Sequence, residues 1–250
     1  MIVLAGPSGA GKSAFMHQLA TAGLQADIAE QLPPGAQTWA QIHNLLPHAK
    51  WLPTLANSMK QGRNREIILQ YDLTCRSFFY VHDYGRDPVL QLLPIAGDVL
   101  VINLRADRDR LIRQWAYAKM GVRTHREIRR KVFAWRIARC AGVASQTLHR
   151  ISPKAERVIA DMGLVKNATK RVNAQLLGVR DNPLTWLHAY RRPGGVEAIF
   201  DRWNAFLSSM AAQGVSVRQI HLEPEPNAPI ADRSNYVEGQ YRWRISRIAS

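Results

Sequence analysis

Runs of mainly apolar residues divide the chain into short strands separated by longer segments. Four of them, at Ile2–Ala5, Glu66–Asp72, Gly97–Leu104 and Val215–Leu222, predict strands, and the continuous run before Leu104 is typical of a strand buried on both faces. A weaker pattern at Leu24–Glu30 predicts a further strand, second in chain order. We therefore expect five strands in one sheet.

Some of the segments between these strands show the periodicity of helices. Apolar residues recur at three- and four-residue spacing in Asp107–Trp115 and Val196–Met210, which predicts helices with one buried face. The segment Trp39–Leu55 is also expected to be helical, with interruptions at its prolines. Strands that alternate with helices indicate the α/β class with a doubly wound parallel sheet.

The long interval between the last two strands divides the chain into three parts. Residues 1–119 are expected to form the α/β core, and residues 120–213 a helical lid or substrate lobe inserted between the fourth and fifth strands. Residues 214–250 supply the last core strand and a tail. That tail is either disordered, packed on the sheet or in contact with a polyanion.

The first strand leads directly into a phosphate-binding motif. Gly6–Ser13 reads GPSGAGKS and matches G-x-x-x-x-G-K-[ST] in full. Its glycines permit the backbone N–H groups to turn inward around a polyphosphate, and the following residues predict a helix whose N-terminus faces the phosphates. Lys12 is expected to reach the β- and γ-phosphates and Ser13 to bind Mg²⁺. The residues expected to hold the nucleotide are Gly6, Ser8, Gly9, Ala10, Gly11, Lys12 and Ser13.

Asp72 ends the strand Glu66–Asp72 and is the best placed carboxylate for chemistry. Ligands of doubly wound sheets gather beyond the carboxyl ends of the strands, so Asp72 is expected to point towards the phosphates. It would then hold the metal ion or accept the proton of a hydroxyl nucleophile. The alternative is that it only caps the following turn.

Composition describes an ordinary globular chain. The 250 residues are 46% hydrophobic, enough for a packed core, and no apolar run is long enough to span a bilayer. Because the first strand begins directly after Met1, we expect no signal segment and a cytoplasmic location. The two cysteines, Cys75 and Cys140, are expected to be reduced core thiols. The scattered histidines and the absence of G-x-S-x-G and H-E-x-x-H argue against zinc enzymes, proteases and esterases.

The net charge of +15 is the unusual feature of the composition, because such an excess of positive charge favours a polyanionic partner. Twelve lysines and arginines but only three acidic residues lie between Arg105 and Arg139. The alternatives are that arginine enrichment follows genomic base composition and that this stretch is a solvated helix face. The residues expected to contact nucleic acid are Arg129, Arg130, Lys131 and Arg136.

Three segments together resemble the P-loop kinase group, which includes nucleoside, nucleotide, shikimate and polynucleotide kinases. They are GPSGAGKS, YDLTCRS after the third strand, and VLVINLRADRDRLIRQW at the fourth, about a fifth of the chain. The resemblance implies a sheet order of 2-3-1-4-5 and a mobile lid that contributes arginines. It assigns lid roles to Arg113, Arg123 and Arg126, and a possible substrate-side carboxylate to Asp27 or Glu30.

These expectations combine into an ATP- and Mg²⁺-dependent kinase with a hydroxyl acceptor. Arg113, with Arg123 or Arg126, would neutralise the migrating phosphoryl group, and Asp72, Asp27 or Glu30 would activate the acceptor. The basic stretch favours an acceptor on nucleic acid, either a polynucleotide end or a 5-hydroxymethyluracil base in DNA. The alternatives are a small-molecule kinase acting on a nucleoside, sugar or other metabolite, and an ATPase or switch that binds nucleic acid without phosphorylating it.

Overall fold

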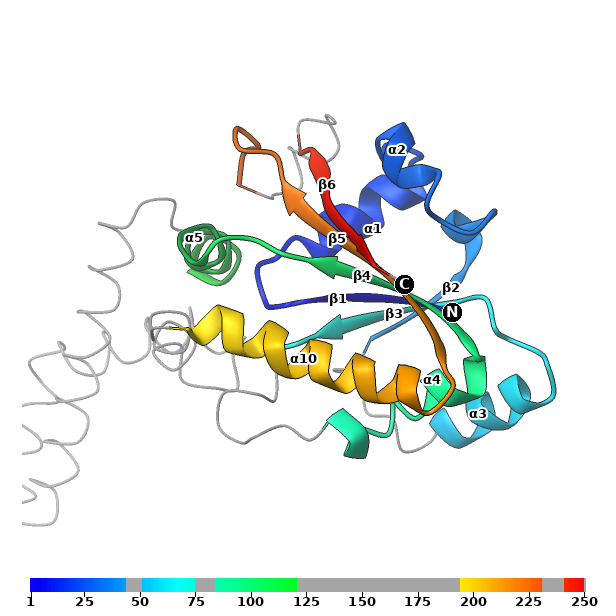
Figure 1. The fold of residues 1–250 in the computed structure, drawn as a ribbon. Coiled ribbons are helices and arrows are strands. Elements are labelled where there is room, and N and C mark those ends of the chain that lie inside the picture. The colour runs from blue at the N-terminus through cyan, green and yellow to red at the C-terminus, as the bar shows by residue number, and fades with distance from the viewer. Residues whose placement is uncertain (44–50, 75–83, 121–193, 231–240, 250) are drawn as a thin grey trace, which may run out of the picture. The chain divides into compact units, whose positions relative to one another are not determined.

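A mostly parallel sheet of six strands forms the centre of the molecule (Figure 1). The computed structural model of the chain describes residues 1–43, 51–74, 84–120, 194–230 and 241–249. Within them, the strands lie in the order β2-β3-β1-β4-β5-β6. Their bounds are β1 Ile2–Gly6, β2 Ala40–His43, β3 Ile67–Asp72, β4 Asp98–Leu104, β5 Ser216–Pro224 and β6 Trp243–Ala249.

Five of the strands run parallel, and the last one reverses. β1 pairs in parallel with β3 on one side and with β4 on the other, so that Ala5 lies between Tyr71 and Asn103. β2 and β5 extend this parallel arrangement, and β6 pairs antiparallel with β5. The α/β class and the mainly parallel sheet expected from the sequence are therefore confirmed, with one antiparallel strand added.

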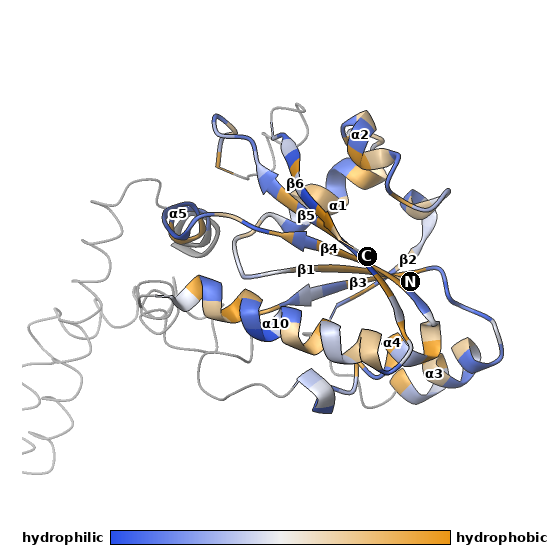
Figure 2. Ribbon diagram, in the orientation of Figure 1, coloured by the Kyte–Doolittle hydropathy of each residue, from blue (hydrophilic) through white to orange (hydrophobic). Residues whose placement is uncertain are grey.

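Helices cover both faces of this sheet (Figure 1). α1 and α2 lie on one face, and α3, α4 and α10 lie on the other. β1 is hydrophobic along its whole length (Figure 2), as expected for a central strand covered on both sides. The helices are α1 Lys12–Ala20, α2 Ala26–Ala29, α3 Leu52–Lys60, α4 Leu92–Ala96, α5 Arg108–Met120 and α10 Gly195–Ala212, with 3-10 turns at η1 Ala36–Thr38 and η2 Tyr84–Arg86.

α10 carries one of the two tryptophans that are fully buried in the described part of the core. Trp203 is fully buried and stacks on Tyr71 of β3 with ring centroids 5.4 Å apart. Its indole N–H donates a 2.9 Å hydrogen bond to the side-chain oxygen of Asn103, which is buried on β4. The period predicted for Val196–Met210 is confirmed, because all seven of its apolar positions are buried.

Two expectations about the region before β3 are wrong. Leu24–Glu30 is not a strand: it contains the short helix α2, of which only Ile28 is buried. The second strand in chain order is instead β2, within the segment Trp39–Leu55 that was expected to be helical. β2 pairs only with β3 and its side chains are exposed or half-buried, so it lacks the apolar run that identified the other strands.

The chain divides into two compact units, Met1–Gln114 with Ala189–Ser250 and Trp115–His188. α10 belongs to the first unit, although the sequence division placed it in the lobe 120–213. The interior of that lobe, residues 121–193, lies outside the described residues. Among the helices that are described, none is long and apolar enough to cross a membrane.

Candidate phosphate-binding site

The loop between β1 and α1 has the backbone that the motif requires. Gly11, which precedes the first residue of α1, has a φ of 93°. This left-handed conformation is one that residues with a side chain rarely adopt. The first N–H groups of α1 have no carbonyl partner within the helix, so they are available to an anion at its N-terminus.

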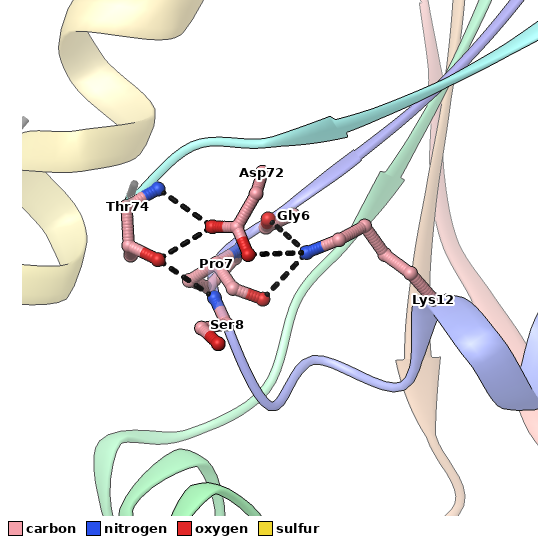
Figure 3. Close-up of polar contacts among 6 residues, drawn as sticks. All are labelled: Gly6, Pro7, Ser8, Lys12, Asp72 and Thr74. Atoms are coloured by element: carbon pink, nitrogen blue, oxygen red, sulfur yellow. Dashed lines mark hydrogen bonds and ion pairs between the residues drawn. The ribbon is translucent and has the colours of Figure 1, made fainter. Parts of the chain in front are cut away.

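Lys12 folds back over this loop (Figure 3). Its Nζ donates hydrogen bonds of 2.7 Å to the carbonyl oxygen of Gly6 and 3.0 Å to that of Pro7. It also lies 3.4 Å from Oδ2 of Asp72. Lys12 and Asp72 are each only 8% exposed, so the ammonium group and the carboxylate form a buried ion pair.

A chain of hydrogen bonds fixes Asp72 to the phosphate-binding loop. Its Oδ1 accepts from the backbone N–H of Thr74 at 2.9 Å and from the Thr74 hydroxyl at 2.5 Å. The same hydroxyl accepts a 3.0 Å hydrogen bond from the backbone N–H of Ser8. The backbone N–H of Leu73 donates to the carbonyl of Gly6 at 3.1 Å. The end of β3 therefore holds the beginning of the loop at several points (Figure 3).

The oxygen atoms near Lys12 suit Mg²⁺ better than a transition metal. Ser13 is exposed at the start of α1, and Asp72 supplies a carboxylate. Mg²⁺ is commonly held by one or two protein oxygens together with phosphates and water. Within the described ranges, no group of three or more His, Cys, Asp or Glu side chains is placed to hold a metal ion.

Asp27 and Glu30 do not join this site. The expectation that they end the second strand is wrong, because Asp27 lies in α2 and Glu30 directly follows it. Both are exposed. The guanidinium of Arg218, near the start of β5, donates to the carbonyl of Gln31. The end of α2 is thus near the amino ends of the strands, whereas the phosphate-binding loop follows the carboxyl end of β1.

The predicted lid arginines are only partly described. Arg113 is exposed on α5. The other basic residues proposed for nucleotide or nucleic acid lie outside the described residues; they are Arg123, Arg126, Arg129, Arg130, Lys131 and Arg136.

A pocket of about 510 Å³ with both charged and apolar walls opens at the carboxyl ends of β4 and β5. The guanidinium of Arg105 lies 4.5 Å from the ring centroid of Phe200 in its wall. One of the pocket's lining residues, Arg105, directly follows Leu104, whose carbonyl oxygen would lie 3.0 Å from a Cβ on Gly6. Its charged lining residues are Arg105, Asp107, Arg110, Glu197, Glu223, Glu225 and Arg244.

Sequence reasoning missed the residues that support the loop. Thr74 follows Asp72 by two positions, a spacing typical of turns in which a carboxylate accepts from the backbone. Tyr241 and Trp243 lie far away in the sequence, and no local pattern connects them with Gly11. The structure nevertheless brings both aromatic rings against that glycine.

Comparisons with known proteins add no family to these observations. The chain matches no protein-family model, no curated protein and no solved structure.

Proposed function

We propose that the protein is an ATP-dependent phosphotransferase, a kinase that transfers the γ-phosphate of ATP to a hydroxyl group. The observation that carries this proposal is the buried pair of Lys12 and Asp72 beside the N-terminus of α1. A cation, a carboxylate and the N-terminus of a helix at the carboxyl edge of a parallel sheet form an arrangement suited to phosphate chemistry.

Lys12 has the donors to hold a phosphate without losing its loop contacts. An ammonium group has three N–H donors, and two of them go to the carbonyls of Gly6 and Pro7. The third is available to Asp72, at a distance longer than an ideal hydrogen bond. A phosphate oxygen would replace the carboxylate as the anionic partner of Lys12, and the buried cation would remain neutralised.

In this exchange the phosphate would take the place of Asp72 beside Lys12, while Thr74 continues to hold Oδ1. Asp72 would bind Mg²⁺ together with Ser13, or it would accept the proton of the acceptor hydroxyl. Mg²⁺ held by these residues would supply charge neutralisation at the phosphates. In the transfer, the acceptor oxygen forms a bond to the γ-phosphorus, the bond to the bridging oxygen breaks, and ADP leaves.

The pocket beyond β4 and β5 supports a nucleoside as the rest of the ligand. Three arginines and four carboxylates line it, so its formal charge is close to neutral and it does not suit a second polyphosphate. The paired planes of Arg105 and Phe200 offer a surface on which a flat ring system can stack. The pocket's lining residue Arg105 is the neighbour of Leu104, which lies against Gly6 at the start of the phosphate-binding loop.

For the acceptor we favour a hydroxyl on nucleic acid, either a polynucleotide end or a 5-hydroxymethyluracil base in DNA. The support is the basic stretch from Arg105 to Arg139. Not all of its charge is available, because Arg105 lies over Phe200 and Arg110 donates to the carbonyls of Ala228 and Pro229 at 2.7 and 2.6 Å. A small-molecule kinase and a nucleic-acid-dependent ATPase are the competing functions.

Transfer of labelled γ-phosphate tests the proposal. Wild type, Lys12→Ala and the control Lys60→Ala, which changes an exposed lysine on α3, would each be given ATP and Mg²⁺. The acceptors would be plain DNA, DNA containing 5-hydroxymethyluracil, RNA and a pool of metabolites. We expect label in a nucleic acid with wild type and Lys60→Ala, and none with Lys12→Ala.

The other outcomes identify the competing functions. Label only in the metabolite pool would show a small-molecule kinase and overturn the assignment of the acceptor. ATP hydrolysis without labelled product would favour an ATPase. Transfer by Lys12→Ala at the wild-type rate would contradict the assignment of the site itself.

A further inference from the structure

The C-terminal segment lies against the phosphate-binding loop. A Cβ added to Gly11 would be 2.8 Å from Cη2 of Trp243 and 3.1 Å from the hydroxyl oxygen of Tyr241. Both aromatic residues are essentially fully buried. Two rings from the end of the chain therefore occupy the space beside the glycine whose left-handed backbone starts α1.

Polar contacts connect the same segment to α1. Gln18 donates from its side-chain amide to the backbone carbonyl of Tyr241, and its side-chain oxygen accepts a 3.1 Å hydrogen bond from the indole N–H of Trp243. The ring of Trp243 packs edge-on against Phe15 with centroids 6.3 Å apart. Gln18 is buried, so these hydrogen bonds satisfy polar groups that water does not reach.

Tyr241 also joins α1 to α5. Its hydroxyl accepts a 2.9 Å hydrogen bond from the side-chain amide of Gln114, and the guanidinium of Arg110 lies 5.6 Å from its ring centroid. The rings of Tyr241 and Trp243 contact each other edge-on at 5.0 Å. One aromatic pair thus touches the loop, the helix that follows it and the helix that follows β4.

We propose that Tyr241 and Trp243 are positioning residues for the phosphate-binding loop. They act through Gly11, by preventing the start of α1 from moving away from the phosphates, and they need not touch the nucleotide. This inference rests on the proposed function as far as it concerns ATP. The other part of the proposal, that the C-terminal segment holds the loop in place, is inferred from the contacts alone.

A rigid loop matters because its binding groups are backbone N–H groups at fixed positions. Without the ring of Trp243, Gly11 borders on a cavity, and glycine has a wide range of accessible backbone conformations. The loop would then have to be ordered again for each binding event, which lowers affinity. Misplacement of binding groups by about 1 Å can reduce rates by about a hundredfold.

The test compares deuterium uptake by the loop with nucleotide affinity in the full-length chain. Trp243→Leu removes the ring and the indole N–H, while Trp243→Phe keeps an aromatic ring and removes the N–H. The matched control is Ile248→Ala, which changes a residue on the same strand that is 52% exposed. Mass spectrometry would follow exchange in peptides covering residues 6–20, and calorimetry would measure binding of MgATP.

We expect uptake in these peptides to rise at least severalfold in Trp243→Leu without ligand, and the Kd for MgATP to rise about tenfold or more. Trp243→Phe should recover most of both properties, and Ile248→Ala should match wild type. Wild-type uptake and affinity in a folded Trp243→Leu would overturn the proposal. If Trp243→Leu does not fold, Trp243→Met, which also removes the ring, takes its place, and wild-type uptake and affinity in that variant would overturn the proposal.

The two proposals fail in different ways. If wild type binds no MgATP, the proposed function is wrong, and the exchange comparison still decides whether Trp243 holds the loop. If wild type binds MgATP and the variants exchange and bind as wild type does, only the positioning role is wrong.

Discussion

Lys12 and Asp72 form an ion pair that is almost completely withdrawn from solvent. Such pairs contribute little net stability, because the cost of desolvating two charges offsets their attraction. Removal of one partner is costly, since it leaves the other buried and unpaired. An ion pair of this kind is therefore better explained by a function that uses the charges than by stability.

The substitution Asp72→Asn separates the contribution of Asp72 to stability from its contribution to phosphoryl transfer. The amide oxygen can still accept from both Thr74 donors, so the turn after β3 should persist. Lys12 loses its buried anionic partner, however, and the free energy of unfolding should fall by about 3–5 kcal/mol. The negative charge that would serve a metal ion or a proton is lost, and phosphoryl transfer should fall by about a hundredfold or more. Urea unfolding and the transfer assay measure the two effects. Wild-type transfer by Asp72→Asn would remove Asp72 from the chemistry.

The lowered pKa of His221 predicts how the free energy of unfolding depends on pH. Burial, with smaller contributions from the charges of Arg105 and Arg247, lowers the pKa of His221 from 6.5 to about 4, and Glu223 opposes this shift. Between pH 6.5 and 4 the unfolded chain therefore binds a proton that the folded chain does not. The free energy of unfolding should fall as the pH drops through this window, by up to about 3 kcal/mol.

The test of this effect is urea unfolding of wild type and His221→Asn at several pH values from 7 to 4. Since asparagine does not titrate, the variant should lose less stability than wild type across the same window. Equal losses in the two proteins would show that other groups cause the acid sensitivity.

Among the secondary-structure elements, α10 is the one whose packing the sequence predicted best. Its large apolar residues, from Val196 to Met210, follow the helical period over four turns, and all seven of them are buried. β1, β3 and β4 were recognised for a similar reason, because central strands need apolar side chains on both faces.

The elements that were missed have weak or ambiguous patterns. β2 and β6 form the two edges of the sheet and present many side chains to solvent, so neither has a continuous apolar run. α2 has four residues, fewer than two turns, and is too short to show a period. The pairing of β6 with β5 depends on contacts between distant parts of the chain, which hydrophobic patterning alone does not specify.

Trp203→Ala tests the attachment of α10 to the sheet. The substitution removes the stacking on Tyr71 and leaves Asn103 without its indole donor. We expect a loss of about 3–5 kcal/mol in the free energy of unfolding. Ser208→Ala, at an exposed position of the same helix, should change it by less than about 0.5 kcal/mol. A small loss in Trp203→Ala, measured by denaturant unfolding, would contradict the packing described here.

Taken as a whole, the molecule carries a net charge of +15, and much of the excess lies in one stretch of the sequence. The motif predicted the phosphate-binding loop because its residue types are local requirements of the loop backbone. The partners of the loop could not be predicted in this way. Thr74 follows β3, Tyr241 precedes β6 and Trp243 begins it, so they meet the loop only through the tertiary fold.

Reversing two charges in the basic stretch tests whether this stretch binds nucleic acid. Arg129→Glu with Arg130→Glu should weaken binding to DNA and reduce its dependence on salt, because each neutralised phosphate contributes to that dependence. The control is Lys60→Glu with Arg63→Glu, which changes the net charge equally at two exposed positions. Fluorescence anisotropy at several salt concentrations measures both. Equal weakening by the two pairs would show that total charge matters and that the stretch has no specific role.

The central claim is that the loop from Gly6 to Ser13 binds a nucleoside triphosphate, and calorimetric titration with MgATP tests it most directly. Wild type and Lys60→Ala should bind one equivalent with the same affinity. Lys12→Ala should bind at least about tenfold more weakly, because this variant has no ammonium group that could bind a phosphate oxygen in place of Asp72. Equal affinity in all three proteins, or no binding by wild type, would contradict the account.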